Sequence, residues 1–112
     1  MLTPKQRAFL QGLAHDLKPV ILLGKNGITD AVAKETNAAL LAHELIKARL
    51  ASSDDGSTGL DDDALALAKK TNAELIARMG RIAILYRAHP DKPKIKLPKK
   101  KKGLFDVVDD DG

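Results

Sequence analysis

Residues 24–27 are the part of this sequence best suited to binding chemistry. They read Gly24, Lys25, Asn26 and Gly27. Glycines at both ends let the backbone approach a phosphate, and free N–H groups at the start of a following helix would face the anion. Lys25 would add positive charge, and Asn26 would add hydrogen-bond donors. Because Asn-Gly is also typical of a tight turn, the spacing alone leaves a simple turn as the alternative.

Charges of opposite sign are separated along the chain. The net charge is +4, but residues 103–112 contribute four aspartates and no base, so the remainder carries +8. Residues 81–102 hold nine bases and one acid, whereas residues 52–63 hold five aspartates. This separation favours a polyanionic partner, although a well-solvated surface with biased tails would give the same pattern.

The composition excludes several kinds of catalytic site. Cysteine is absent, which excludes disulfides, thiolate zinc sites, iron–sulfur clusters and cysteine nucleophiles. The three serines lie within residues 52–57, away from any histidine. His43 beside Glu44 could begin a metal site, but His15 and His89 have no evident reason to converge on it, so helix termination or a hydrogen bond is favoured for His43. We expect a non-enzymatic protein without cofactor or metal.

A strand before the tetrapeptide and a helix after it must hold it in place. Residues 20–23 form a short, fully apolar run after Pro19, as in a buried strand. Thr29 can cap a helix over residues 30–42. Upstream, the order of Thr3, Pro4 and Gln6 predicts a capping box and a helix over residues 4–14.

The next segment alternates in a way that predicts a half-exposed strand. Over residues 45–50, Ile46, Ala48 and Leu50 point to one side, while Lys47 and Arg49 point to the other. Because this strand follows a strand and a helix, the two strands should be parallel and joined by a right-handed crossover.

The second half of the chain predicts one more helix and a hairpin. The polar, acidic loop at residues 52–63 leads into a helix at about 62–71, which the loop's end should cap. Residues 64–79 could form one long helix on propensity alone. However, Asn72 as a left-handed helix end and a turn at Gly80 favour strands at 74–79 and 81–87. The prediction is an α/β fold in the order α-β-α-β-α-β-β with a four-stranded mixed sheet.

The ends of the chain carry further expectations. Residues 1–98 are expected to form one domain, and residues 99–112 a flexible tail that is first lysine-rich and then acidic. The lysines at 99–102 could be an electrostatic arm or simply a solubilising segment. The longest strongly apolar run is too short to span a membrane, and the N-terminus lacks the apolar core of a signal peptide. We therefore expect a cytoplasmic protein without membrane contact.

Four short blocks of sequence carry a family resemblance. They read GLAHDLKPV at residues 12–20, GKNGIT at 24–29, HELIK at 43–47, and GR at 80–81 with LYR at 85–87. In this order and spacing, over roughly residues 2–98, they resemble the CRM domain in its bacterial stand-alone YhbY-like form. That RNA-binding module is named for chloroplast RNA splicing and ribosome maturation. The resemblance implies a four-stranded mixed sheet packed with helices, similar to the C-terminal domain of bacterial translation initiation factor three.

The resemblance also implies a function and a set of site residues. It implies binding to structured RNA and, for bacterial members, a role in large ribosomal subunit assembly. The family's GxxG loop falls on Gly24, Lys25, Asn26 and Gly27, and Lys18 and Lys47 are expected to be auxiliary contacts near that loop.

The expected partner is therefore RNA, either ribosomal RNA or a precursor large subunit, and not a small-molecule substrate. Two alternatives remain open at this point. One is a protein-interaction adaptor that docks a basic partner through the acidic loop and tail, and the other is a general nucleic-acid binder.

Overall fold

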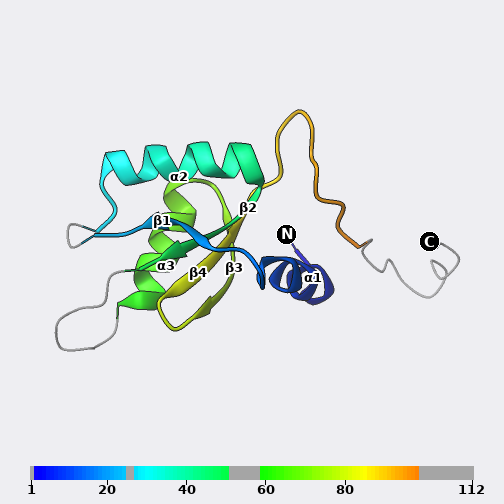
Figure 1. Ribbon diagram of the computed structural model, residues 1–112, viewed down its shortest axis with the longest axis horizontal. Coiled ribbons are helices and arrows are strands. Elements are labelled where there is room, and N and C mark those ends of the chain that lie inside the picture. The colour runs from blue at the N-terminus through cyan, green and yellow to red at the C-terminus, as the bar shows by residue number, and fades with distance from the viewer. Residues whose placement is uncertain (1, 25–26, 51–58, 99–112) are drawn as a thin grey trace, which may run out of the picture.

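The computed structural model describes residues 2–24, 27–50 and 59–98. Its elements, in chain order, are α1 (Pro4–Ala14), β1 (Pro19–Leu22), α2 (Asp30–His43), β2 (Leu45–Arg49), α3 (Leu60–Lys70), β3 (Glu74–Met79) and β4 (Ile82–Tyr86). The strands form one sheet in the order β1-β2-β4-β3 (Figure 1). The β1–β2 pair is parallel and the other two pairs are antiparallel. The predicted α/β order and four-stranded mixed sheet are confirmed.

Local signals fix the ends of most elements as predicted. The Thr3 hydroxyl accepts the Gln6 backbone N–H at 3.1 Å, and the Gln6 side chain accepts the Thr3 N–H at 3.0 Å, which completes the capping box of α1. Thr29 caps α2 through its side chain. Asn72 has a φ of 56° just after α3, and Gly80 has a φ of 60° in the turn between β3 and β4.

The start of α3 differs from the prediction. The helix begins at Leu60, two residues earlier than expected, and its N-cap is Gly59, with a φ of 113° and no side-chain hydrogen bond. Glycine tolerates this left-handed conformation, so no aspartate is needed as a cap. The three aspartates that follow lie in the first turn, where they oppose the positive end of the helix dipole. One of them, Asp61, forms an ion pair with Arg78.

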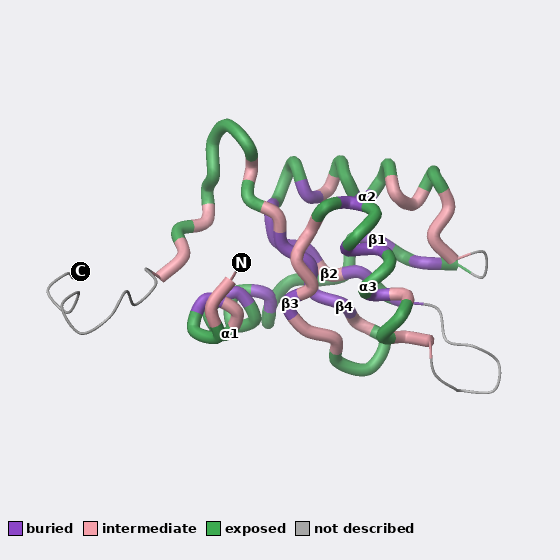
Figure 2. The backbone as a smooth tube through the Cα atoms, turned by 180° about the vertical axis from the view of Figure 1, so that it is seen from behind, coloured by how far each residue is buried: buried purple, intermediate pink, exposed green. Residues whose placement is uncertain are grey.

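Helices pack against both faces of the sheet. On one face, α2 and α3 bury Leu40 and Leu67 against Ile21 and Ile46. On the other face, α1 buries Leu10 among residues of β2, β3 and β4; this second cluster comprises Leu10, Ala14, Leu45, Ile76, Ile84 and Tyr86. Figure 2 shows buried segments concentrated in the sheet and exposed turns on the outer sides of α1 and α2. Tyr86 is therefore a core residue, as its place in an apolar strand predicts.

Residues 88–98, here called the C-terminal strap, run past the second cluster without regular structure. Ile95 and Leu97 of the strap pack against that cluster. The Gln6 side chain donates to the Pro98 carbonyl at 2.9 Å, which places the end of the strap beside the first turns of α1.

Glu44, between α2 and β2, binds the strap between His89 and Ile95. Its carboxylate is buried and accepts the backbone N–H groups of His89 at 2.7 Å, Lys94 at 2.8 Å and Ile95 at 2.9 Å. Burial alone would raise the pKa of Glu44, but these three hydrogen bonds and the nearby His89 outweigh it and lower that pKa. Burial, and then the charge of Glu44, raise the pKa of Tyr86. One buried carboxylate thus fixes three backbone positions of the strap.

Two further features of the described residues concern membranes and metal ions. No helix among them is long and apolar enough to cross a membrane. No cluster of three or more histidine, aspartate or glutamate side chains among them could hold a metal ion.

Candidate nucleic-acid interface

The sheet face that α1 packs against is covered only in part. Alternation along β1 directs Ile21 into the core and leaves Val20 and Leu22 on this face, where they are 46% and 66% exposed. In β2, Leu45 belongs to the cluster under α1, so Lys47 and Arg49 project on the same side as Leu45. Val20, Leu22, Lys47 and Arg49 are called the open sheet face below. This face combines two exposed aliphatic side chains with two bases.

The turn at residues 24–27 follows β1 directly. The Gly27 N–H donates to the Gly24 carbonyl at 3.0 Å, and Gly27 has a φ of 71°. A Cβ atom added at either glycine would meet no atom within 4 Å, so the space around both backbone positions is open. Lys25 and Asn26 lie outside the described residues, and their predicted role stays a prediction. The described residues thus show two accessible glycine positions, joined by a backbone hydrogen bond, between β1 and the N-cap of α2.

The structure places Lys18 and Lys47 at the other end of β1 from this turn. Lys18 precedes β1, and Lys47 pairs with Pro19, the first residue of that strand. Lys47 also donates from Nζ to the His15 carbonyl at 3.2 Å. From Lys18 to Gly24 the extended chain advances about 20 Å, so Lys18 does not lie beside the turn. Lys47 is nearer to the turn but still about four strand positions, or about 13 Å, from Gly24.

Arg49 is the basic residue of β2 nearest to the turn. The Leu23 N–H donates to the Arg49 carbonyl at 2.8 Å, one residue before Gly24. Because Arg49 lies two residues beyond Lys47 on the same side of β2, the two bases extend along β1 from its start toward the turn. The alternation in residues 45–50 already placed Arg49 on the exposed side of the strand, so this signal could have identified it as a site residue.

Three basic residues elsewhere on the fold form ion pairs with acids among the described residues. Lys70 on α3 lies 3.6 Å from Asp30, and Arg78 on β3 pairs with Asp61. Arg7 on α1 lies 3.3 Å from Glu74. Lys18, Lys47 and Arg49 form no such pair with any residue that the structure describes, which leaves their charge facing solvent within this part of the chain.

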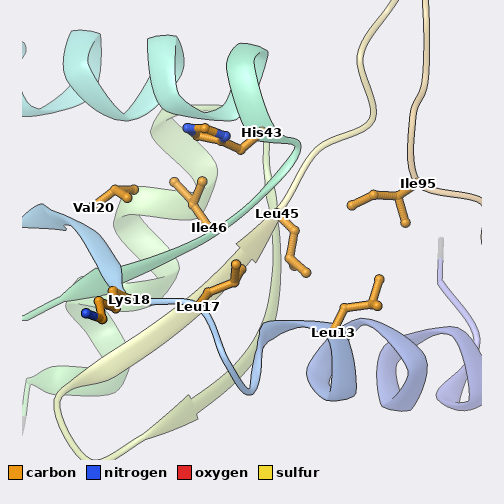
Figure 3. A pocket seen from close by; sticks show the side chains of 8 residues that line it. All are labelled: Leu13, Leu17, Lys18, Val20, His43, Leu45, Ile46 and Ile95. Carbon is orange, nitrogen blue, oxygen red and sulfur yellow. The ribbon is translucent and has the colours of Figure 1, made fainter.

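A cavity of about 410 Å³ adjoins the open sheet face. Six aliphatic side chains line it, together with Lys18 and His43 (Figure 3). They come from α1, the connection between α1 and β1, β1 itself, the end of α2, β2 and the strap, so segments far apart in the sequence meet here. His43 ends α2 and is exposed at the cavity, beside the buried Glu44. Sequence reasoning identified neither the cavity nor the role of Glu44.

Comparison with known proteins places the chain in a family. Residues 2–87 match the family model of the CRS1 / YhbY (CRM) domain. A Haemophilus influenzae protein named "RNA-binding protein" is 42% identical over 99 residues, which cover 88% of this chain and 97% of that protein. The Bacillus subtilis "Probable RNA-binding protein YqeI" is 36% identical over 98 residues, 88% of this chain and all of that one.

A solved structure shows the same fold. It is the solution structure of a Staphylococcus aureus protein described as a candidate RNA binder. That protein is 33% identical, and the match has a TM-score of 0.71 and covers 88% of this chain and 100% of the other. With the family model matching residues 2–87 and these relatives covered over nearly their full length, the chain belongs to the CRS1 / YhbY (CRM) domain family.

Proposed function

We propose that this protein binds structured RNA through the open sheet face, Lys18 and the turn at residues 24–27. The observation that carries the proposal is the pair of basic side chains beside β1: Lys47 and Arg49 project from an otherwise aliphatic face, and Arg49 lies nearer to the accessible turn. Phosphates are recognised by basic side chains, and Lys47 and Arg49 of β2 present two of them beside β1. The names of the two relatives support RNA as the polyanion.

The side chains available favour recognition of the shape and the backbone of RNA over stacking on its nucleobases. The chain has three aromatic residues, of which Tyr86 is buried and Phe9 lies on α1. On the open sheet face the exposed apolar residues are Val20 and Leu22, which can contact sugars but offer no aromatic platform. Lysine and arginine contacts to phosphate would then supply most of the affinity.

The first turn of α2 is a weaker phosphate site than its N–H groups alone suggest. Asp30 occupies this turn and would repel an anion there, even though Lys70 lies 3.6 Å from it. We therefore assign the larger electrostatic contribution to Lys18, Lys47 and Arg49, and assign the turn the role of admitting the RNA backbone closely.

The more specific form of the proposal concerns the RNA. Within residues 1–98 we propose a non-catalytic, cytoplasmic binding domain for ribosomal RNA that acts during assembly of the large ribosomal subunit. The family resemblance of the sequence blocks supports this form. Sedimentation of the native protein with precursor large subunits would support it, and sedimentation only as free protein would count against it.

The experiment that tests RNA binding itself is a salt titration. With about three to five phosphate contacts, the logarithm of the affinity for a structured RNA should fall linearly with the logarithm of the salt concentration, with a slope of about 2 to 4.5. The measurement is a binding isotherm at several salt concentrations, with duplex DNA of equal length as the matched competitor. Salt-independent binding would contradict the electrostatic account, and equal displacement by DNA would indicate a general nucleic-acid binder.

A further inference from the structure

The cavity beside the open sheet face is an apolar site whose lining remains partly exposed to solvent. Leu13, Leu17 and Val20 line it and are 44%, 39% and 46% exposed. Figure 3 shows these side chains, together with Ile95, arranged around one space between α1, β1 and the strap. Lys18 lines the same space. Lys47 of β2 is close to it, because Lys47 pairs with Pro19, the first residue of β1. An occupant that is apolar and also carries negative charge would complement both parts of this surface.

The end of this chain has that composition. In residues 99–112 the side chains larger than glycine are four lysines, four aspartates and four apolar residues. The apolar residues all fall within 104–108, as Leu104, Phe105, Val107 and Val108. Aspartates at 106 and 109–111 interrupt and follow them. A tail that only needed to be soluble would gain nothing from an aromatic and three aliphatic side chains.

The tail is also long enough to reach the cavity. The strap ends at Pro98, whose carbonyl accepts a hydrogen bond from Gln6 on α1. Leu13 lies on the same helix seven residues further on, a distance of about 10 Å along its axis. The five residues 99–103 can span about 17 Å when extended. Residues 104–108 can therefore arrive at the cavity without any change in the strap.

We propose that residues 104–108 dock in this cavity within the same molecule. Docking there brings the aspartates at 106 and 109–111 next to Lys18 and Lys47. This step rests on the proposed function: the docked tail competes with RNA phosphates for the two lysines. The tail thereby acts as an intramolecular inhibitor of RNA binding. Salt should weaken this competition because it screens exposed charges beyond a Debye length of about 8–10 Å.

A spin label in the full-length chain tests the docking directly. Because the chain has no cysteine, G112C provides a single attachment site. The label should broaden the NMR signals of Leu13, Leu17 and Val20, and F105S/V107S in the same labelled chain should remove that broadening. The matched control is K99S/K101S, which also alters two tail residues but keeps the apolar segment and should retain the broadening. Broadening that is absent, or that F105S/V107S leaves unchanged, would overturn the docking.

Two further measurements separate this proposal from its alternatives. Mixing spin-labelled chain with an isotopically labelled, spin-free chain should give no broadening, because the contact is intramolecular; strong broadening would assign the cavity to a second copy and overturn the proposal. Full-length F105S/V107S should bind structured RNA roughly two- to fivefold more tightly at low salt, with a smaller gain at high salt. Broadening by the label without this gain supports the docking and contradicts the open sheet face as the RNA surface.

Discussion

Replacing Lys47 and Arg49 together with glutamate is expected to weaken binding to structured RNA by at least about tenfold at physiological salt. The two substitutions remove two phosphate contacts from the open sheet face and place repulsive charges there. The fold should persist, because Arg49 is exposed and Lys47 makes one side-chain hydrogen bond within the described residues, to the His15 carbonyl. The measurement is the RNA dissociation constant, with thermal unfolding followed in parallel.

The matched control makes the same change in net charge elsewhere. Lys5 on α1 and Lys69 on α3 are both exposed and lie away from the open sheet face. K5E/K69E should weaken RNA binding by less than about threefold, since it alters only the long-range field of the protein. Equal losses in the two double variants would show that net charge, and not the open sheet face, determines the affinity.

Glu44→Gln is expected to lower the free energy of unfolding by about 1.5–3 kcal/mol. Glutamine fills the same space but has one acceptor oxygen, so it cannot accept all three backbone N–H groups that the carboxylate accepts. Its amide nitrogen would face one of those N–H groups, donor against donor, in a buried site. Denaturant unfolding measures the loss, and faster proteolysis within residues 88–98 would show that the strap is released. Unchanged stability and unchanged proteolysis would contradict the role of Glu44.

The effect of this substitution should depend on pH in a defined direction. The folded pKa of Glu44 lies below its ordinary value of 4.5, so folding favours the carboxylate form. The stabilisation is therefore complete above the unfolded pKa and is lost as the pH falls through the lower, folded pKa. The difference in stability between the wild type and Glu44→Gln should be constant near pH 7 and shrink at acidic pH. A difference that grows on acidification would contradict this assignment.

Features set by neighbouring residues could be predicted from the sequence. The capping box of Thr3 and Gln6, the cap at Thr29 and the turn at Gly80 each depend on residues within a few positions of one another. The alternation in residues 45–50 also predicted that Ile46, Ala48 and Leu50 share one buried side of β2, because the period of a strand is local. These signals were sufficient for the type and order of the elements.

Features set by distant contacts could not be predicted in the same way. Lys47 was expected near the turn, but the parallel register places it opposite Pro19, and no local pattern sets that register. The role of Glu44 depends on His89, Lys94 and Ile95, which lie 45 to 51 residues away. The cavity likewise forms only when α1, β1, α2, β2 and the strap are brought together.

The most direct test of the central claim is to locate the RNA on the protein by NMR. Titration of the isotopically labelled chain with a structured RNA should shift the amide signals of residues 18–29 and 45–50 most strongly, including those of Lys25 and Asn26. The signals of β3 should change little, because β3 lies at the opposite edge of the sheet from β1, and those of α3 should change little, because α3 packs against the other face of the sheet. The largest shifts on α3 and β3, with residues 18–29 and 45–50 unaffected, would contradict RNA binding through the open sheet face and the turn.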